Sequence, residues 1–175
     1  MSTPIIAIDP GTSESAILLW RDNTCAGEIV PNQVILERLP KFPPELFPAN
    51  PILAIEMIAC YGMSVGKEVF ETCVWIGRFY QAWKIASGRD PQLITRLTVK
   101  MHHCHSMQAK DSNIRQALIY KYGAPGTKKQ QGVTYGLKSH LWSAFAIATY
   151  VSERANQTAF DKVEKDISSA FEKVP

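Results

Sequence analysis

An apolar run near the start of the chain reads PIIAIDPGT over residues 4–12 and ends in an aspartate, a proline and a glycine. A short run bounded by turn residues predicts a buried strand, residues 4–9, that enters a turn directly after Asp9. Two further strands are predicted over residues 15–20 and about 25–36, with a turn at residues 21–23 between them. The three segments are typical of an antiparallel meander.

A second apolar run, residues 51–57, carries Glu56 near its end and is predicted to be the fourth strand. The proline-rich passage before it, residues 40–51, is interpreted as a surface connection, because proline disrupts helices and central strands. The pattern then predicts a helix over residues 64–86, a strand over 92–99, and helices over 111–122 and 136–151. The tail from Thr158 is polar and amphipathic. This order indicates one mixed α/β domain.

Size and composition place the chain among ordinary globular proteins. Its 175 residues fit one domain with a sizeable core, and 46% of them are hydrophobic and 20% charged. No apolar run approaches the roughly 18 residues that a membrane span needs. The first residues lack the basic segment and cleavage site of a signal peptide. We therefore expect a cytoplasmic protein, without a membrane partner.

The net charge of +3 conceals an uneven distribution. Residues 96–138 contain eight basic residues and one acid, Asp111, which gives this segment +7 and leaves −4 for the rest of the chain. A basic stripe predicts a polyanionic partner, because each lysine or arginine that reaches a phosphate releases condensed counterions. Charge bias alone leaves a merely solvated face as the alternative.

Asp9 and Glu56 each close a predicted strand, with about fifty residues between them. Sites in open α/β sheets form beyond the carboxyl ends of neighbouring strands. If these two strands are parallel neighbours, both carboxylates project into one small space, where they repel each other and lose hydration. A divalent cation removes that penalty, and oxygen ligands suit Mg²⁺ or Mn²⁺. The pair therefore predicts a metal site.

Two more residues are candidates for this site, each with a plainer interpretation. His140 lies near the start of the predicted helix 136–151, where a lone histidine is commonly a half-exposed surface residue. Asp111 opens the predicted helix 111–122, and either Asp111 or Ser112 is expected to be its N-cap for backbone reasons alone. A zinc site at His102-His103-Cys104-His105 is a weaker alternative, because adjacent residues on an extended chain point in opposite directions.

Several motifs resemble those of the RuvC-like Holliday junction resolvases, phage-type, of the RNase H-like superfamily. Ile8-Asp9-Pro10-Gly11-Thr12 resembles the first motif of the family, and Leu53-Ala54-Ile55-Glu56 is similar to the second. The segment SHLWSAFAIA, residues 139–148, resembles the final catalytic helix. Residues 109–115 and 126–129 look like phage-type members. The resemblance spans about residues 5–151.

The resemblance implies an RNase H-like mixed five-stranded sheet flanked by helices over residues 1–155, with a C-terminal amphipathic helical tail over 156–175. It implies a homodimeric endonuclease that cuts branched DNA, in particular four-way junctions, by two-metal-ion hydrolysis with Mg²⁺, or Mn²⁺. Asp9 would anchor the metals with Glu56 beside it, and His140 would stand at a ligand position. The residues expected to contact the DNA backbone are Lys100, Lys110, Arg115, Lys128, Lys129 and Lys138.

One departure from the family concerns Ser143, three residues after His140, where many relatives place an aspartate. This difference leaves open how a second ion is held, and Asp111 is the candidate to supply the missing carboxylate. It also keeps a second function in view, a non-catalytic branched-DNA-binding protein that retains the RNase H-like fold. An ATP-binding protein of the actin and Hsp70 class is disfavoured, because that class needs two domains that clasp the nucleotide.

Overall fold

The computed structural model describes residues 2–42, 50–60, 62 and 64–171, with side chains described up to residue 162. Five strands form one sheet in the order β3-β2-β1-β4-β5. The strands are β1 (Ile5–Asp9), β2 (Glu14–Arg21), β3 (Thr24–Pro31), β4 (Ile52–Met57) and β5 (Gln92–Thr95). The helical elements are α1 (Asn32–Arg38), the 3₁₀ helix η1 (Leu39–Lys41), α2 (Lys67–Ser87), α3 (Arg96–Cys104), α4 (Asp111–Tyr122) and α5 (Leu141–Phe171).

The sheet is mixed, and its first three strands form the predicted antiparallel meander. β1 also pairs with β4 in parallel, and Ile8 lies opposite Ile55 in that register. β4 pairs in parallel with β5 on its other side. Since β1 and β4 run side by side in the same direction, the residues that follow Ile8 and Ile55 emerge at the same edge of the sheet. The predicted five-stranded mixed sheet is therefore confirmed.

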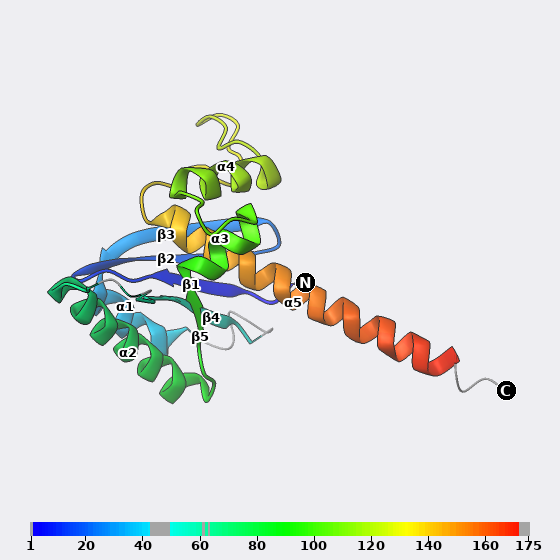
Figure 1. Cartoon of the computed structure of the whole chain (residues 1–175), viewed down its shortest axis with the longest axis horizontal. Coiled ribbons are helices and arrows are strands. Elements are labelled where there is room, and N and C mark those ends of the chain that lie inside the picture. Colours follow the sequence, from blue (N-terminus) through cyan, green and yellow to red (C-terminus); the bar gives the residue numbers. More distant parts are fainter. Residues whose placement is uncertain (1, 43–49, 61, 63, 172–175) are drawn as a thin grey trace.

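Helices cover both faces of this sheet (Figure 1). Side chains alternate along β1, so that Ile5 and Ala7 belong to one core cluster while Ile6 and Ile8 belong to the other. The first cluster packs against α5, and the second packs against α1 and α2. The alternation explains why the central strands are apolar at nearly every position, because a strand between two helical layers is buried on both sides.

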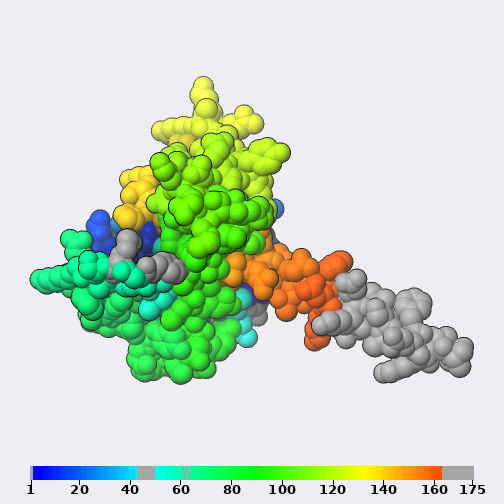
Figure 2. Space-filling model, viewed as in Figure 1, coloured from blue at the N-terminus to red at the C-terminus, as the bar shows by residue number. Residues whose placement is uncertain are grey.

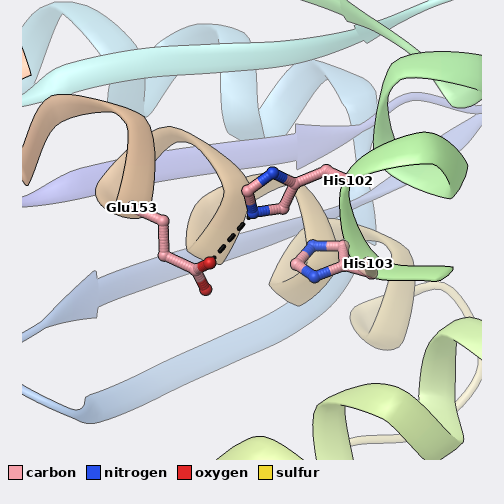
Figure 3. A group of neighbouring side chains, drawn as sticks. All are labelled: His102, His103 and Glu153. Carbon is pink, nitrogen blue, oxygen red and sulfur yellow. Dashed lines mark hydrogen bonds and ion pairs between the residues drawn. The ribbon is translucent and has the colours of Figure 1, made fainter. Parts of the chain in front are cut away.

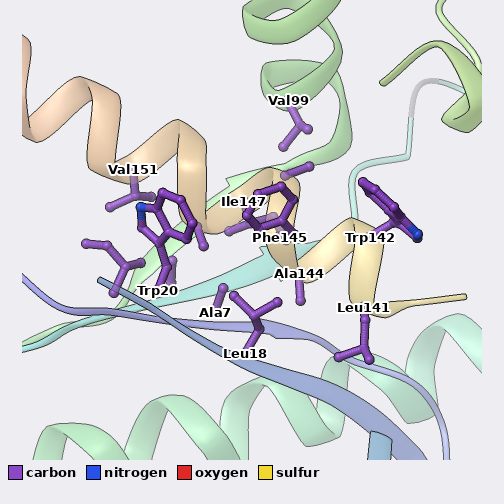
Figure 4. Close-up of a cluster of buried hydrophobic side chains, with 14 of the residues drawn as sticks. Ala7, Leu18, Trp20, Val99, Leu141, Trp142, Ala144, Phe145, Ile147 and Val151 are labelled. Carbon is purple, nitrogen blue, oxygen red and sulfur yellow. The ribbon is translucent and has the colours of Figure 1, made fainter. Parts of the chain in front are cut away.

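The α5 face of the core depends on small residues that let the helix approach the strands. Ala144 and Ala148 are fully buried, and Phe145 fills the space beside them (Figure 4). The Phe145 ring meets Trp20 of β2 edge-to-face, with the ring centroids 5.3 Å apart. Aromatic pairs of this geometry add about 0.5–1.5 kcal/mol beyond the area that they bury. This packing fixes the start of α5 next to the sheet edge that carries Asp9.

Two predicted strands are too long. The strand predicted over residues 25–36 is wrong beyond Pro31, because Asn32 turns the chain away from the sheet and begins α1. The Asn32 backbone N–H donates to the Ser13 carbonyl, and α1 then buries Ile35 against the core. The strand predicted over 92–99 is wrong beyond Thr95, whose hydroxyl accepts a hydrogen bond from the Thr98 N–H and thereby caps α3.

Helix boundaries also differ from the sequence prediction. The helix predicted over 136–151 begins at Leu141, because Gly136 and Ser139 have φ values of 81° and 45°, outside the helical region. It continues as one helix to Phe171, so the predicted tail is part of α5, and in Figure 1 this part projects from the body. Phe160 is 65% exposed there, while the side chains of residues 163–175 lie outside the described part.

The prediction that Asp111 or Ser112 is the N-cap of α4 is wrong. The N-cap is Lys110, whose backbone N–H donates to the Asn113 side chain at 2.8 Å. Asp111 is thereby left in the first turn, with its side chain free to contact another element. Within the described part of the chain, no helix is long and apolar enough to cross a membrane.

Candidate active site

Asp9 and Glu56 lie at adjoining ends of the parallel strands β1 and β4, one residue after the paired Ile8 and Ile55. Their side chains are 13% and 16% exposed, and a hydrogen bond links the two carboxyl groups. The geometry predicted from the two strand ends is thus present. Two largely buried acids in contact form a centre whose charge must be balanced.

The turn after Asp9 is held in place by a polar network from α1 and β2. The Gly11 backbone N–H donates to the Ser15 hydroxyl at 3.1 Å, and the Asn32 side-chain amide donates to the Gly11 carbonyl at 2.9 Å. The Ser15 hydroxyl in turn donates to the Asn32 side-chain oxygen. Ser15 and Asn32 are both buried, so water competes poorly for these bonds. They keep Asp9 in position at the end of its strand.

The two acids differ from ordinary surface carboxyls in their readiness to ionise. Burial and the negative charge of Asp9 raise the pKa of Glu56 to about 8. Burial also raises the pKa of Asp9, although the hydrogen bond and positive charge of His140 oppose the shift. Near neutral pH, the pair therefore resists carrying two negative charges unless a cation is close by. Such shifts are frequent at catalytic and metal centres.

The donor set fits a hard divalent cation. Glu56 Oε2 is buried and has no hydrogen-bond partner among the described residues. A buried carboxylate oxygen without a partner is costly, and coordination of a cation removes that cost. Asp9, Glu56 and the neighbouring His140 are the residues that could hold such an ion, and their oxygen-rich composition suits Mg²⁺ or Mn²⁺.

His140 joins the two acids from the residue just before α5. Its Nδ1 lies 3.0 Å from Asp9 Oδ2, while 69% of the side chain remains exposed. The His140 carbonyl accepts the Ala144 N–H, so the start of α5 fixes the backbone that carries the ring. When Nδ1 donates to Asp9, the lone pair of Nε2 is left for a ligand or a proton. His140 lies one residue before the helix and not inside it as predicted, but its predicted proximity to Asp9 is present.

Asp111 does not reach the two acids directly. Its Oδ1 lies 2.5 Å from Nη2 of Arg96, and its side chain is 76% exposed. Arg96 Nη1 lies 3.6 Å from Glu56 Oε2, which is too long for a hydrogen bond. Asp111 therefore contacts the centre only through Arg96. Among the described residues, the one compact group of three potential ligand atoms is His102, His103 and Glu153, so the structure gathers neither His140 nor Asp111 around both acids.

Arg96 is the residue of this centre that sequence reasoning misses as a site residue. The sequence presents it only as one charge of the basic stripe, because residues 92–99 are expected to form one strand. In the structure, Arg96 is the first residue of α3 and follows the end of β5, the strand next to β4. The sequence signal for Arg96 was its place directly after β5, because β5 is the parallel strand next to the one that carries Glu56.

A hollow of about 430 Å³ opens beside His140. Its walls include Arg96, Asp111, Ser112, Arg115, Ser139, His140, Trp142 and Ser143. A second hollow, of about 190 Å³, is lined by Asp9, residues 11–16, Ile29 and His140. His140 thus borders both hollows, and Ser143 presents a hydroxyl group, not a carboxylate, to the larger one.

Five of the six residues predicted to contact DNA are exposed: Lys110, Arg115, Lys128, Lys129 and Lys138. Lys100, on α3, is half-buried. Lys128 and Lys129 lie in the loop between α4 and α5, which Figure 2 shows as the yellow projection above the green α3 and α4. Of these residues, Arg115 also lines the larger hollow, and Lys138 directly precedes Ser139 in its wall.

The histidine cluster is not on an extended chain, as the sequence suggested, but on the last turn of α3. His102 and His103 lie near Glu153 of α5, with potential ligand atoms within 4.8 Å of one another (Figure 3). His102 Nε2 lies 2.9 Å from Glu153 Oε2, and His103 Nε2 lies 2.9 Å from the Ala146 carbonyl. Both histidines are therefore half-buried and in contact with α5.

Glu153 is already neutralised, which disfavours a metal at this cluster. The Lys121 ammonium donates to Glu153 Oε2 at 2.6 Å, and the Tyr122 hydroxyl donates to Oε1 at 2.6 Å. Burial acts to raise the pKa of Glu153, but the bonds from Lys121, Tyr122 and His102 hold it below the usual value. Because these donors come from α3 and α4, Glu153 ties both helices to α5. We name this group, His102, Lys121, Tyr122 and Glu153, the Glu153 clasp.

No family model matches the chain, and a search of curated proteins finds no match. Among solved structures, Thermus thermophilus RuvC superposes with a TM-score of 0.64 and 17% identity, covering 89% of this chain and 97% of that protein. T. thermophilus RuvC in complex with a Holliday junction substrate superposes with a TM-score of 0.61 and 16% identity, covering 85% and 92%. A likeness at this identity establishes the fold, which is RNase H-like as predicted.

Proposed function

We propose that this protein is an endonuclease that cuts branched DNA, with the four-way junction as its substrate. The observation that carries the proposal is the meeting of Asp9 and Glu56 at adjoining strand ends of an RNase H-like fold, with His140 in contact with Asp9. One of the structurally similar proteins is described in complex with a Holliday junction substrate, which supports this choice of substrate. The phage-type assignment within the family remains a prediction.

The proposed reaction is hydrolysis of a phosphodiester with Mg²⁺, or Mn²⁺, held by Asp9, Glu56 and His140. Bound divalent cations would supply Lewis-acid charge to the phosphate and lower the pKa of an attacking water. Asp9 contributes a carboxylate that the turn network holds in place, and Glu56 contributes the buried oxygen that makes no hydrogen bond among the described residues and has only Arg96 as an ion-pair partner. His140 Nε2, left free when Nδ1 donates to Asp9, would be the histidine atom that binds the ion.

A two-ion arrangement is the finer part of the proposal. Two ions need more donors than Asp9 and Glu56 provide, and Ser143 supplies no carboxylate on the His140 side. Asp111 is the acid that lines the larger hollow beside His140, although its carboxylate is paired with Arg96 in this structure. Movement of Arg96 away from Asp111 would release that carboxylate for a second ion.

We further propose a homodimer, because a four-way junction has two-fold symmetry and paired cuts require two sites related by an axis. On α2, Ile76 and Trp83 are buried in the core and are not available to a second copy. The outer face of the same helix carries Phe70 and Val74, one turn apart and 61% and 62% exposed. Exposed apolar groups at this spacing on one helix are suited to pack against a second copy.

The basic side of the molecule is proposed to fix the DNA backbone. Lysines that reach phosphates bind without reading bases, so they set position and affinity more than sequence preference. Lys128 and Lys129 are adjacent, exposed and have no ion pair among the described residues, so both are available to phosphate.

The deciding experiment incubates the purified protein with labelled four-way junctions, flaps and linear duplexes, with and without Mg²⁺ or Mn²⁺. We expect metal-dependent cuts that are confined to branched substrates. The absence of an acidic residue at Ser143 favours one alternative, a branched-DNA-binding protein without turnover. Tight junction binding with no cleavage in either metal would establish that alternative.

A further inference from the structure

The larger hollow contains a stacking surface that metal-dependent hydrolysis does not itself require. Trp142 lies in its wall, and its indole N–H donates to the Leu137 carbonyl at 3.0 Å, which fixes the orientation of the ring. The Arg115 guanidinium carbon lies over this ring, 4.8 Å from its centroid. Arg115 is exposed and also lines the hollow, so the indole orders a planar cation at the surface of the hollow.

The rest of the wall is suited to an anionic group. Arg96 Nη1 is buried and has no hydrogen-bond partner among the described residues. Ser112, Ser139 and Ser143 add hydroxyl groups. The single acid among the lining residues, Asp111, is already paired with Arg96. A volume of about 430 Å³ lies within the usual range of roughly 300–1,000 Å³ for small-molecule sites, which is large enough for one nucleotide.

We propose that this hollow receives the nucleotide that adjoins the scissile phosphate. Its base stacks on the Arg115–Trp142 pair, and its phosphate faces Arg96. The proposal rests on the proposed function and adds the site that holds the cleaved strand. His140 borders the hollow and contacts Asp9, so the hollow adjoins the centre that would hold the scissile phosphate. Bases at a branch point lack a continuous stack, and arginine planes offer them a replacement.

Arg115 then has a different role from the lysines that contact the backbone. A lysine at this position keeps the positive charge but loses the planar face. Stacking therefore predicts that Arg115→Lys loses base stacking and cleavage rate to the same extent as Arg115→Ala. A purely electrostatic role predicts that Arg115→Lys retains function. Arg154 provides a control for charge, because it is an arginine of α5 outside the hollow.

The experiment uses junctions with 2-aminopurine at the nucleotide next to the mapped cut, bound to full-length protein that carries Asp9→Asn. We expect fluorescence quenching with Asp9→Asn alone and with added Arg154→Ala, and no quenching with added Arg115→Lys or Arg115→Ala. With Asp9 intact, both Arg115 variants should cut about tenfold more slowly, because the loss of one base stack weakens the hold on the strand. Thermal melts confirm that the variants are folded.

Quenching that survives in Arg115→Lys, or cleavage by both Arg115 variants at the rate of the unaltered protein, would overturn the stacking site while leaving the nuclease function intact. A failure of the proposed function looks different, because the unaltered protein would then cut no junction, whether or not it binds one, and there would be no mapped cut beside which a nucleotide could be held.

Discussion

His140 Nδ1 lies 3.0 Å from Asp9 Oδ2, although 131 residues separate the two in the sequence. The contact joins the end of the first strand to the start of the last helix. Asp9 is largely buried and His140 is mostly exposed, so the pair connects an interior carboxylate with the solvent side of the centre. This connection, with Glu56 alongside, places the acids of the strand ends within reach of a large substrate.

Asp9→Asn should abolish junction cleavage, with a loss of at least about a hundredfold, while the affinity for junctions changes less than about threefold. The amide removes the negative charge that a cation requires but keeps the size of the side chain and one oxygen. Single-turnover cleavage and a binding titration without metal measure the two effects. An Asp9→Asn protein that cuts at the normal rate would falsify the assignment of the centre.

Glu56→Gln should stabilise the metal-free protein at alkaline pH relative to the unaltered chain. Because burial and Asp9 raise the folded pKa of Glu56 to about 8, the protonated form is favoured in the folded state. The contribution of protonated Glu56 to the free energy of unfolding is fully present below the unfolded pKa of about 4.5. It is lost as the pH rises to about 8, and the loss is a few kcal/mol at most.

Urea unfolding at about pH 5 and pH 8.5 in EDTA measures this difference. We expect the unaltered protein to lose stability over that interval and Glu56→Gln to lose much less. Adding Mg²⁺ at the higher pH should raise the melting temperature of the unaltered protein, because a ligand that binds only the folded state stabilises it. The same addition should leave Glu56→Gln almost unchanged. Equal pH profiles for the two proteins would contradict the burial of an ionisable Glu56.

Much of the fold and half of the centre were predictable from the sequence. The strand ends at Asp9 and Glu56 were marked by apolar runs, and parallel pairing of their strands brings them together. Helix α1 was missed because the apolar residues on both sides of Pro31 resemble one continuous strand, while the turn network of Asn32 that ends β3 depends on contacts with Ser15 and Gly11. Tertiary contacts of this kind override a local pattern.

The contacts of Arg96 and Glu153 were unpredictable for the same reason. Arg96 reaches Glu56 and Asp111 only because β5 stops at Thr95 and α3 begins there. Glu153 collects donors from α3 and α4, whose distances along the chain from Glu153 range from 31 to 51 residues. Charge counting places these basic residues in one stripe, whereas the structure divides them between the centre, the proposed DNA-binding side and the Glu153 clasp.

Asp111→Asn tests whether this acid acts as a ligand or through Arg96. Since its side chain is exposed, loss of the pair with Arg96 should cost at most about 1 kcal/mol of folding free energy. Cleavage should fall only a few-fold, because Arg96 would remain near Glu56 but be less well oriented. Chemical unfolding and initial cleavage rates provide the comparison. A loss of activity as large as that of Asp9→Asn would identify Asp111 as a direct metal ligand.

Replacement of Lys128 and Lys129 together by alanine should weaken junction binding and reduce its salt dependence. Each phosphate contact contributes about 0.9 to the slope of log affinity against log salt, so two lost contacts reduce the slope by roughly 2. The control replaces Arg154 and Lys162, two basic residues of α5 far along the chain from the loop, by alanine. Equal slopes for the two double variants would show that the loop does not contact DNA.

Glu153→Gln should loosen α3 and α4 from α5 and cost about 2 kcal/mol, in line with the ~1.5–3 kcal/mol of hydrogen bonds to charged groups. Because the folded pKa of Glu153 is lowered, its stabilising contribution is present above the unfolded pKa of about 4.5 and is lost as the pH falls through the folded value. Urea unfolding at about pH 7 and pH 3.5 should therefore show a large difference in the free energy of unfolding between the unaltered protein and Glu153→Gln at neutral pH, and a small difference in acid. Glu71→Gln, which removes an exposed ion pair with Lys67 on α2, is the matched control and should cost less than about 0.5 kcal/mol. If Glu153→Gln were as mild as this control at neutral pH, α3 and α4 would have to be held to α5 by apolar packing alone.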